Sequence, residues 1–288
     1  MTISAVNHAP AKNSAESLGI VLAKKIRPAC IPKGILQTFW SDASLRNLIT
    51  PALTGQFLVS TFPFPDPMHQ VKVTYYLEVL SSWCHYAEPV WTSLQERYHG
   101  KVEFEWKLAL MLPGDFPVSQ AQCDWFYRRS GPISQQPQML SSGWFDAKLK
   151  GNYEAANLVA EAGRDFGFTD DRLRRFLTTS ALRDGRKIGE PDTAVSLVAQ
   201  KFKLNTSKLR AAAESKAVRQ RVEASTTAFH AHKINQRPAF IITDTIGDKA
   251  VFSGLGKIEP LVATIDSMLA DCTAYASFSA HFGPIPAK

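Results

Sequence analysis

A chain of 288 residues with 45% hydrophobic and 20% charged residues has the composition of a globular protein with a large core. Its 33 Lys and Arg residues exceed its 26 Asp and Glu residues, which gives a formal charge of +7, but the two signs are interspersed along the chain. This distribution argues against a nucleic-acid-binding patch and suits the attraction of small anions.

Signals for membrane insertion, secretion and metal binding are missing from the sequence. No apolar run approaches the roughly 18 residues of a membrane-spanning helix, and the N-terminus has no secretory pattern. The cysteines, Cys30, Cys84, Cys123 and Cys272, form no C-x-x-C pair that would bind zinc or cycle as a dithiol. We therefore expect a cytoplasmic protein with reduced thiols and no metal, membrane or nucleic-acid partner.

Residues 1–68 are predicted to be an N-terminal extension that precedes the main domain. The segment begins with small polar residues and ends in T-F-P-F-P-D-P, residues 61–67, which alternates proline with other residues. Such a pattern is typical of a polyproline-II connector. A domain boundary near Met68 follows.

The stretch Val71–Val90 is predicted to be a strand that leads directly into a helix. Val71–Leu80 is rich in β-branched and aromatic residues, and a helical pattern starts near Trp83. Ser81 is placed to cap the helix, and Cys84 falls in its first turn. The macrodipole there lowers a thiol pKa and favours the thiolate. The alternative is that Cys84 is an ordinary buried apolar residue.

A second strand and a long helical region follow. His85–Tyr98 is predicted to be a helix bent at Pro89, and Lys101–Met111 a strand, which completes a β-α-β unit with parallel strands. Residues 119–232 are predicted to be helical throughout. The clearest segments there are Asn152–Phe166, Asp170–Thr178, Asp192–Lys203 and an interrupted Thr206–His232.

Strands return near the C-terminus. Ala239–Thr243 and Ala250–Ser253 are predicted to form a hairpin that turns at Gly247-Asp248, and Lys257–Ala274 an amphipathic helix. The order β-α-β, helices, β-β-α indicates an α/β fold. One domain consists of residues 69–118 and 233–288, and residues 119–232 are an inserted helical subdomain.

This order, together with Y-Y-L-E-V-L-S-S-W-C-H-Y-A-E-P (Tyr75–Pro89) and I-N-Q-R-P-A-F-I-I (Ile234–Ile242), resembles the DsbA-like family. That family includes DsbA oxidoreductases, kappa-class glutathione transferases and 2-hydroxychromene-2-carboxylate isomerases. The resemblance implies a thioredoxin-like fold with a large all-helical insertion. It also implies a cis peptide bond at Arg237–Pro238, beside the active cysteine. The resemblance does not extend to the first 70 residues.

The sequence departs from the dithiol members at the active position. Ser81 stands where they have the attacking cysteine, and Cys84 stands at the resolving position, so S-S-W-C cannot close a disulfide. A serine here resembles the glutathione-using branch, in which the hydroxyl donates to the cofactor thiolate. The resemblance thus implies catalytic roles for Ser81 and Cys84. The residues that we expect to bind substrate or cofactor are Ser82, Trp83, His85, Arg237, Pro238 and Gly254.

Several of these residues have a plainer interpretation. Ser81 is equally suited to be only a helix cap, and Trp83 to be a packing residue. His85 could tune Cys84, but adjacent helical residues point about 100° apart. The turn that contains Gly254 lacks the acidic pair of the glutathione-using branch, which leaves only backbone N–H groups to offer.

The function that we expect is thiol-dependent, glutathione-using chemistry (oxidoreductase, transferase or isomerase) on a small organic substrate. One alternative is a monothiol enzyme that forms mixed disulfides through Cys84. Another is a non-catalytic, peptide-binding thioredoxin-like module. The expected partners are a small thiol and an organic molecule, and a homodimer is left open.

Overall fold

The computed structural model describes residues 69–135, 140–254, 256–283 and 286. The predicted N-terminal extension and connector, residues 1–68, lie outside the described residues, and so does Cys30. Within the described ranges, no helix combines the length and the apolar character needed to cross a membrane.

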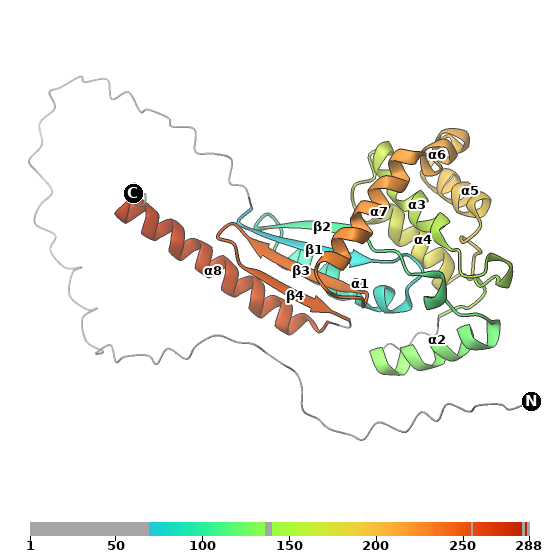
Figure 1. The fold of residues 1–288 in the computed structure, drawn as a ribbon, viewed down its shortest axis with the longest axis horizontal. Coiled ribbons are helices and arrows are strands. Elements are labelled where there is room, and N and C mark those ends of the chain that lie inside the picture. The colour runs from blue at the N-terminus through green and yellow to red at the C-terminus, as the bar shows by residue number, and fades with distance from the viewer. Residues whose placement is uncertain (1–68, 136–139, 255, 284–285, 287–288) are drawn as a thin grey trace, which may run out of the picture. The chain divides into compact units, whose positions relative to one another are not determined.

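A four-stranded mixed sheet forms the centre of the domain (Figure 1). The strand order is β2-β1-β3-β4, with β1 parallel to β2 and antiparallel to β3, and with β3 antiparallel to β4. The strands are β1 (Val71–Leu77), β2 (Val102–Leu108), β3 (Ala239–Asp244) and β4 (Lys249–Ser253). The predicted β-α-β unit and C-terminal hairpin are therefore confirmed.

Eight α-helices are present in the described part of the chain. They are α1 (Ser82–Arg97), α2 (Gln120–Ser134), α3 (Glu154–Ala162), α4 (Arg172–Leu182), α5 (Pro191–Phe202), α6 (Thr206–Ala213), α7 (Lys216–Ala231) and α8 (Ile258–Phe282). Short 3-10 turns occur at η1 (Pro113–Asp115), η2 (Ala147–Leu149) and η3 (Gly163–Phe166).

Different helices cover the two faces of the sheet. Val73 and Tyr75 of β1 belong to the larger core, which includes Trp91 of α1 and Ile265 of α8. Tyr76 points to the opposite face, in a smaller cluster with residues of α7 and β3. This alternation is the period-2 pattern that a strand buried on both faces requires.

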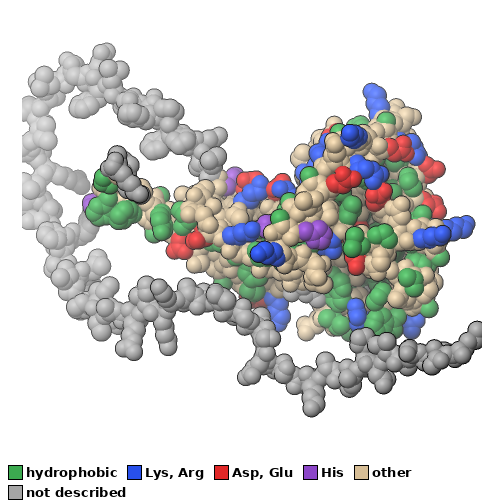
Figure 2. All heavy atoms as spheres, in the orientation of Figure 1, with side chains coloured by type: hydrophobic (Ala, Val, Ile, Leu, Met, Phe, Trp, Pro, Cys, Tyr) green, Lys and Arg blue, Asp and Glu red, His purple; other side chains and the backbone are tan. Residues whose placement is uncertain are grey.

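The helical insertion runs from α2 to α7, between β2 and β3 (Figure 1). The predicted interruption of its last segment is confirmed: α6 ends at Ala213, and Ser215 caps α7 by accepting the Val218 N–H group at 3.2 Å. On the face drawn in Figure 2, basic side chains are dispersed among acidic ones, as their order in the sequence indicates.

The end of β1 differs from its predicted end. The strand stops at Leu77 rather than Leu80, because the next backbone groups bind side chains instead of a neighbouring strand. Val79 N–H donates to Asn157 Oδ1 at 3.1 Å, and Leu80 N–H donates to Glu78 Oε2 at 2.8 Å. The strand-to-helix junction is thus a loop held by polar side chains.

The last helix is longer than predicted. It continues to Phe282 instead of ending at Ala274, because no proline or glycine lies between Ala274 and Gly283. Gly283 has a positive φ of 74°, a conformation that ends helices and favours glycine.

A buried ion network joins the insertion to α1. Arg174 of α4 has a fully buried side chain, and its Nη1 donates to Glu88 Oε1 of α1 at 2.6 Å. Its Nε also donates to Asp171 Oδ1 at 2.7 Å, and Trp91 Nε1 donates to the other Asp171 oxygen at 2.8 Å. Pairing offsets the desolvation of these charges and fixes α1 against the insertion.

Candidate active site

The N-terminus of α1 opens onto a cavity of about 250 Å³. Ser81 caps this helix: its Oγ accepts the Cys84 N–H group at 3.3 Å, which confirms the predicted cap. The helix therefore begins at Ser82 instead of His85. No acidic residue lies in its first turn, so no carboxylate of the helix itself occupies its free N–H groups.

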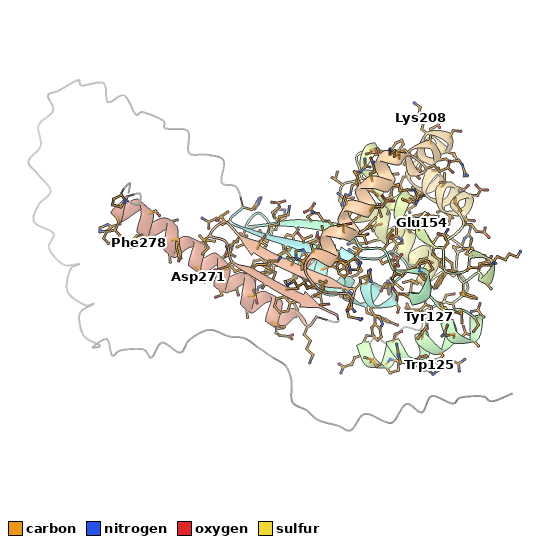
Figure 3. All side chains as sticks on the ribbon, viewed as in Figure 1. Trp125, Tyr127, Glu154, Lys208, Asp271 and Phe278 are labelled. Carbon is orange, nitrogen blue, oxygen red and sulfur yellow. The ribbon has the colours of Figure 1, made fainter. Side chains whose placement is uncertain are left out.

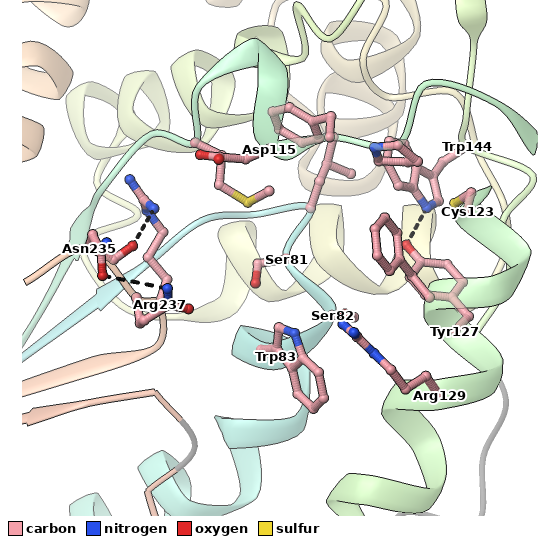
Figure 4. A pocket seen from close by; sticks show the side chains of 16 residues that line it. Ser81, Ser82, Trp83, Asp115, Cys123, Tyr127, Arg129, Trp144, Asn235 and Arg237 are labelled. Carbon is pink, nitrogen blue, oxygen red and sulfur yellow. Dashed lines mark hydrogen bonds between the residues drawn. The ribbon is translucent and has the colours of Figure 1, made fainter. Parts of the chain in front are cut away.

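Residues from five parts of the chain line the cavity, and the fifth is Trp144, which follows α2 (Figure 4). The first turn of α1 lies between α2 on one side and the loop before β3 on the other, with the segment after β2 across from it. The lining residues are Leu80, Ser81, Ser82, Trp83, Met111, Asp115, Phe116, Pro117, Cys123, Phe126, Tyr127, Arg129, Trp144, Asn235, Gln236 and Arg237. The structure thus brings together Ser81, Ser82, Trp83 and Arg237 of the predicted site.

Cys84 does not line this cavity. Its side chain is buried, and its Sγ accepts the Glu78 N–H group at 3.5 Å. Burial raises the pKa of the Cys84 thiol to about 12, although the Ser81 hydroxyl and the Glu78 N–H group act in the opposite direction. The predicted lowering of this pKa is wrong, because loss of solvation outweighs the helix N-terminus.

The loop before β3 places Arg237 at the cavity. The Arg237–Pro238 peptide bond is cis, as the resemblance implied. The Arg237 guanidinium donates to the backbone carbonyls of Ala109, at 2.5 Å, and of Leu110. Pro238 is buried, and its carbonyl accepts the Gly254 N–H group at 2.9 Å.

Two residues of the predicted site, Gly254 and His85, are not placed to bind a ligand in the cavity. The N–H group of Gly254 is occupied by the Pro238 carbonyl, so it is not available to a ligand. His85 is half-buried outside the cavity, where burial and the charges of Arg183 and Arg175 lower its pKa. Its position toward α4 follows from the angle between successive helical side chains. Neither residue supports the role that the resemblance implied.

Two arginines make the cavity electropositive. Arg129 of α2 extends toward Trp83, with its guanidinium carbon 6.0 Å from that ring centroid and 4.8 Å from the ring of Trp125 (Figure 4). Neither Arg129 nor Arg237 forms an ion pair with a carboxylate among the described residues. Two cationic side chains therefore line the cavity, of which Arg237 already donates through each guanidinium nitrogen to a backbone carbonyl, and Asp115 is the only acidic side chain among the described lining residues.

An aromatic wall closes the side of the cavity next to α2. Trp144 Nε1 donates to Tyr127 OH at 2.6 Å, which fixes both rings. Figure 3 shows Tyr127 on the inner side of α2 and Trp125, which is 54% exposed, on the outer side. Cys123 is buried in this wall, where burial raises its pKa to about 12. The wall offers apolar surface for an organic molecule.

The sequence analysis missed Glu78, Asn157, Asp115 and Arg129. Glu78 is buried below the loop that carries Ser81, and burial raises its pKa to about 7. The sequence feature that indicates Glu78 is a charged residue inside the apolar run Y-Y-L-E-V-L. Asn157 is likewise a polar residue inside the apolar run A-A-N-L-V. Asp115 and Arg129 lie in segments whose composition is typical of a protein surface, and no local pattern there indicates that they line a cavity.

The sheet topology and its helices define a protein of the thioredoxin-fold class. Residues 72–266 match the family model of the DSBA-like thioredoxin domain. The chain belongs to this family, which includes thiol oxidoreductases. No curated protein matches the sequence.

The chain is similar to solved structures at low sequence identity, and the first of these shows the same fold. A protein from Nitrosomonas europaea, provisionally assigned as a protein disulfide isomerase, aligns with a TM-score of 0.54 and 15% identity, covering 70% of this chain and 98% of that one. The cytosolic disulfide reductase DsbM of Pseudomonas aeruginosa gives 0.48 and 18%, with coverages of 72% and 99%. Pseudomonas aeruginosa DsbA gives 0.47 and 15%, with coverages of 76% and 92%.

Proposed function

We propose that this protein binds a small thiol, glutathione in the simplest case, and uses its sulfur for chemistry on a small organic molecule. The observation that supports the proposal is the placement of Ser81 and Cys84 at the N-terminus of α1. Ser81 lines the cavity, whereas the only cysteine of the S-S-W-C motif is buried beneath it. A reactive sulfur at this position therefore comes from a ligand.

The N-terminus of α1 has the groups that stabilise a bound thiolate. Ser82 and Trp83 lie in the first turn, where N–H groups have no acceptor within the helix. The Ser81 oxygen accepts from the Cys84 N–H group, and its own hydrogen, which lies within reach of Cys84 Sγ, would turn toward the ligand sulfur in the complex. These donors and the macrodipole lower the pKa of a thiol held there.

The charges around the cavity complement those of glutathione. That tripeptide carries two carboxylates, one ammonium group and one thiol. Arg129 and Arg237 are suited to the carboxylates, and Asp115 is suited to the ammonium group. This agreement in the number and sign of charges supports a peptide-like thiol over an uncharged one.

The organic substrate would lie against the aromatic wall of Tyr127 and Trp144. A bound thiolate that adds to an electrophilic carbon of the substrate forms a C–S bond. The electron pair displaced by the addition stays on the substrate. Transfer retains the C–S bond and places the proton lost by the thiol on the substrate, whereas isomerisation expels the thiolate again after rearrangement. In reduction the thiolate of a second thiol molecule attacks the sulfur, the C–S bond breaks with its electron pair on carbon, and that carbon takes up a proton, so the products are a disulfide and a substrate reduced by two electrons. The three outcomes share the same first complex.

The compartment is also part of the proposal. The described cysteines Cys84, Cys123 and Cys272 are all free and buried, which suits a reducing cytoplasm. The burial of Cys84 argues against the monothiol alternative, since the thiolate is the nucleophile. We assign no role to a homodimer.

Calorimetric titration with glutathione tests the proposal. The unmodified protein is expected to bind, and Ser81→Ala to lose roughly tenfold or more in affinity, because a hydrogen bond to a charged group is removed. Thiolate absorbance against pH should show a lowered pKa for the bound thiol, and less lowering in the variant.

The matched control is Ser215→Ala. It removes a cap of the same type from α7, at a position outside the cavity lining, so it reproduces the loss of helix stability without changing the ligand site. Absence of measurable heat and of a thiolate signal in the unmodified protein would contradict the proposal. Binding of an extended peptide instead would favour the non-catalytic module.

A further inference from the structure

A closed set of hydrogen bonds lies below the Ser81 loop. Asn157 Nδ2 donates to Glu78 Oε1 at 2.5 Å, and Leu80 N–H donates to Glu78 Oε2 at 2.8 Å. Asn157 Oδ1 accepts the Val79 N–H group at 3.1 Å. The side chains of Glu78 and Asn157 are each 1% exposed, so water does not replace these bonds.

This set joins parts of the chain that are far apart in sequence. Glu78, Val79 and Leu80 form the junction between β1 and α1, and Asn157 belongs to α3 of the helical insertion. The Ser81 N–H group also donates to the Glu78 carbonyl at 3.1 Å. Both the carboxylate and the backbone carbonyl of Glu78 therefore hold the backbone next to Ser81.

The pattern of donors requires an ionised carboxylate. Each Glu78 oxygen accepts an N–H group, and a protonated oxygen would instead direct its hydrogen at one of those donors. The ionisable groups that face Glu78 are Arg237 from the loop before β3, Cys84 from α1 and Tyr127 from α2. Arg237 is the only cation among them.

We infer that Glu78 and Asn157 are positioning residues, which hold the backbone at Val79 and Leu80 so that the Ser81 hydroxyl and the first N–H groups of α1 meet the ligand sulfur. The consequence for ligand binding rests on the proposed function, whereas the ordering of the loop does not. Loss of either side chain frees the loop from α3 without removing any group that contacts the ligand.

Protonation of Glu78 should have the same effect as loss of Asn157. A neutral carboxyl gives up either the Asn157 or the Leu80 hydrogen bond, so order in the loop depends on the ionised form. Because burial raises the pKa of Glu78 to about 7, this transition falls near neutrality. The loop is expected to be ordered above that pH and looser below it.

Exchanging the two functional groups gives the sharpest test. In Glu78→Gln alone, two N–H donors face each other whichever way the amide is turned. The double variant E78Q/N157D moves the carboxylate to α3 and restores every bond. The amide introduced at position 78 donates to the carboxylate introduced at position 157, while Leu80 N–H and Val79 N–H keep their acceptors. Asn157→Ala removes the link and keeps the Glu78 charge.

The primary measurement is independent of ligand. Amide NMR signals and hydrogen exchange at Val79 and Leu80 should titrate near pH 7 in the unmodified protein. At about pH 8, exchange at these amides should rise at least tenfold in E78Q and in Asn157→Ala, and return to within about threefold of the original rate in E78Q/N157D. A role in packing alone predicts no such recovery.

Asn157→Asp alone makes an opposite prediction. It places two carboxylates in contact, so they share one proton near neutrality and keep the loop ordered. The loop should then loosen as pH rises, which reverses the direction seen in the unmodified protein. Unchanged amide signals across these variants, or no recovery in the double variant, would overturn the inference.

Glutathione calorimetry on the same variants separates the two claims. Asn157→Ala should lose about tenfold in affinity, and E78Q/N157D should recover it. If no variant binds glutathione but the amides behave as stated, the proposed ligand fails and the positioning role stands. If the unmodified protein binds and Asn157→Ala binds equally well, the positioning role fails. Should Asn157→Ala not fold, E78Q and the double variant decide the question.

Discussion

At the scale of single residues, one cysteine of a dithiol enzyme provides both the position at the helix N-terminus and the sulfur. In this protein the position belongs to Ser81 and the sulfur to Cys84. Ser81 lines the cavity at the helix N-terminus, and Cys84 supplies a sulfur that accepts hydrogen bonds inside the core. A low dielectric around the sulfur disfavours the thiolate more than the helix N-terminus favours it. Under the proposed function, the site binds a thiol instead of providing one.

This assignment predicts that Cys84 is unreactive in the folded protein. With its pKa raised to about 12, the thiolate fraction near pH 8 is about three orders of magnitude below that of an ordinary exposed thiol. Alkylation by iodoacetamide, resolved by peptide mass spectrometry, should modify Cys84 only after unfolding in urea. Rapid native labelling would contradict the buried position.

At the scale of elements, the contact between α4 and α1 holds the helical insertion next to the site. Arg174 is the centre of this contact, with Glu88 and Asp171 as its partners. The same helix α1 carries Ser81 at its start, so the ion network sets the direction of the helix N-terminus relative to the insertion. A charge left unpaired there is costly.

Replacement of Arg174 by Ala is expected to lower the free energy of unfolding by roughly 3 kcal/mol, because Asp171 loses its cation and the buried Glu88 keeps only the partly exposed Arg175, at 3.3 Å. Arg172→Ala on the same helix is the matched control. Arg172 pairs with Asp170 in an exposed position, and such pairs contribute less than about 1 kcal/mol. Urea denaturation of both variants measures the difference, and equal losses would refute the role of the network.

At the scale of the whole molecule, Glu78 connects pH to stability. Its pKa rises from 4.5 in the unfolded chain to about 7 on folding, mainly through burial. Between these pH values the folded protein holds a proton that the unfolded chain has released. Stability from this group is therefore complete below about pH 4.5 and is lost as pH rises through 7.

The corresponding prediction compares the unmodified protein with Glu78→Gln. The difference between their free energies of unfolding should fall by on the order of 3 kcal/mol as pH rises from about 4.5 to above 7. Acid thus loosens the loop while it favours the folded state, since removing a buried charge outweighs one hydrogen bond. Other titrating groups, such as His85, cancel in the difference. A constant difference would show that Glu78 keeps an ordinary pKa.

Local patterns in the sequence predicted the elements of this fold well. Alternating and apolar runs indicated β1 to β4, and Ser81 was recognised as a cap because capping depends on residues within one turn. The position of Pro238 before an apolar strand, with the family resemblance, indicated the loop beside the site. These features depend on neighbours in sequence.

Local patterns in the sequence did not determine which side chains face the cavity. Ser81 and Cys84 are three residues apart, so both have the geometry of a helix start, and helical period alone favours neither. Packing of the insertion decided between them: Asn157, 79 residues from Glu78, closes the loop, and Tyr127 and Arg129 form the opposite wall. Burial, and with it the pKa of each group, arises only when distant segments exclude water together, and a sequence read locally contains no measure of that exclusion.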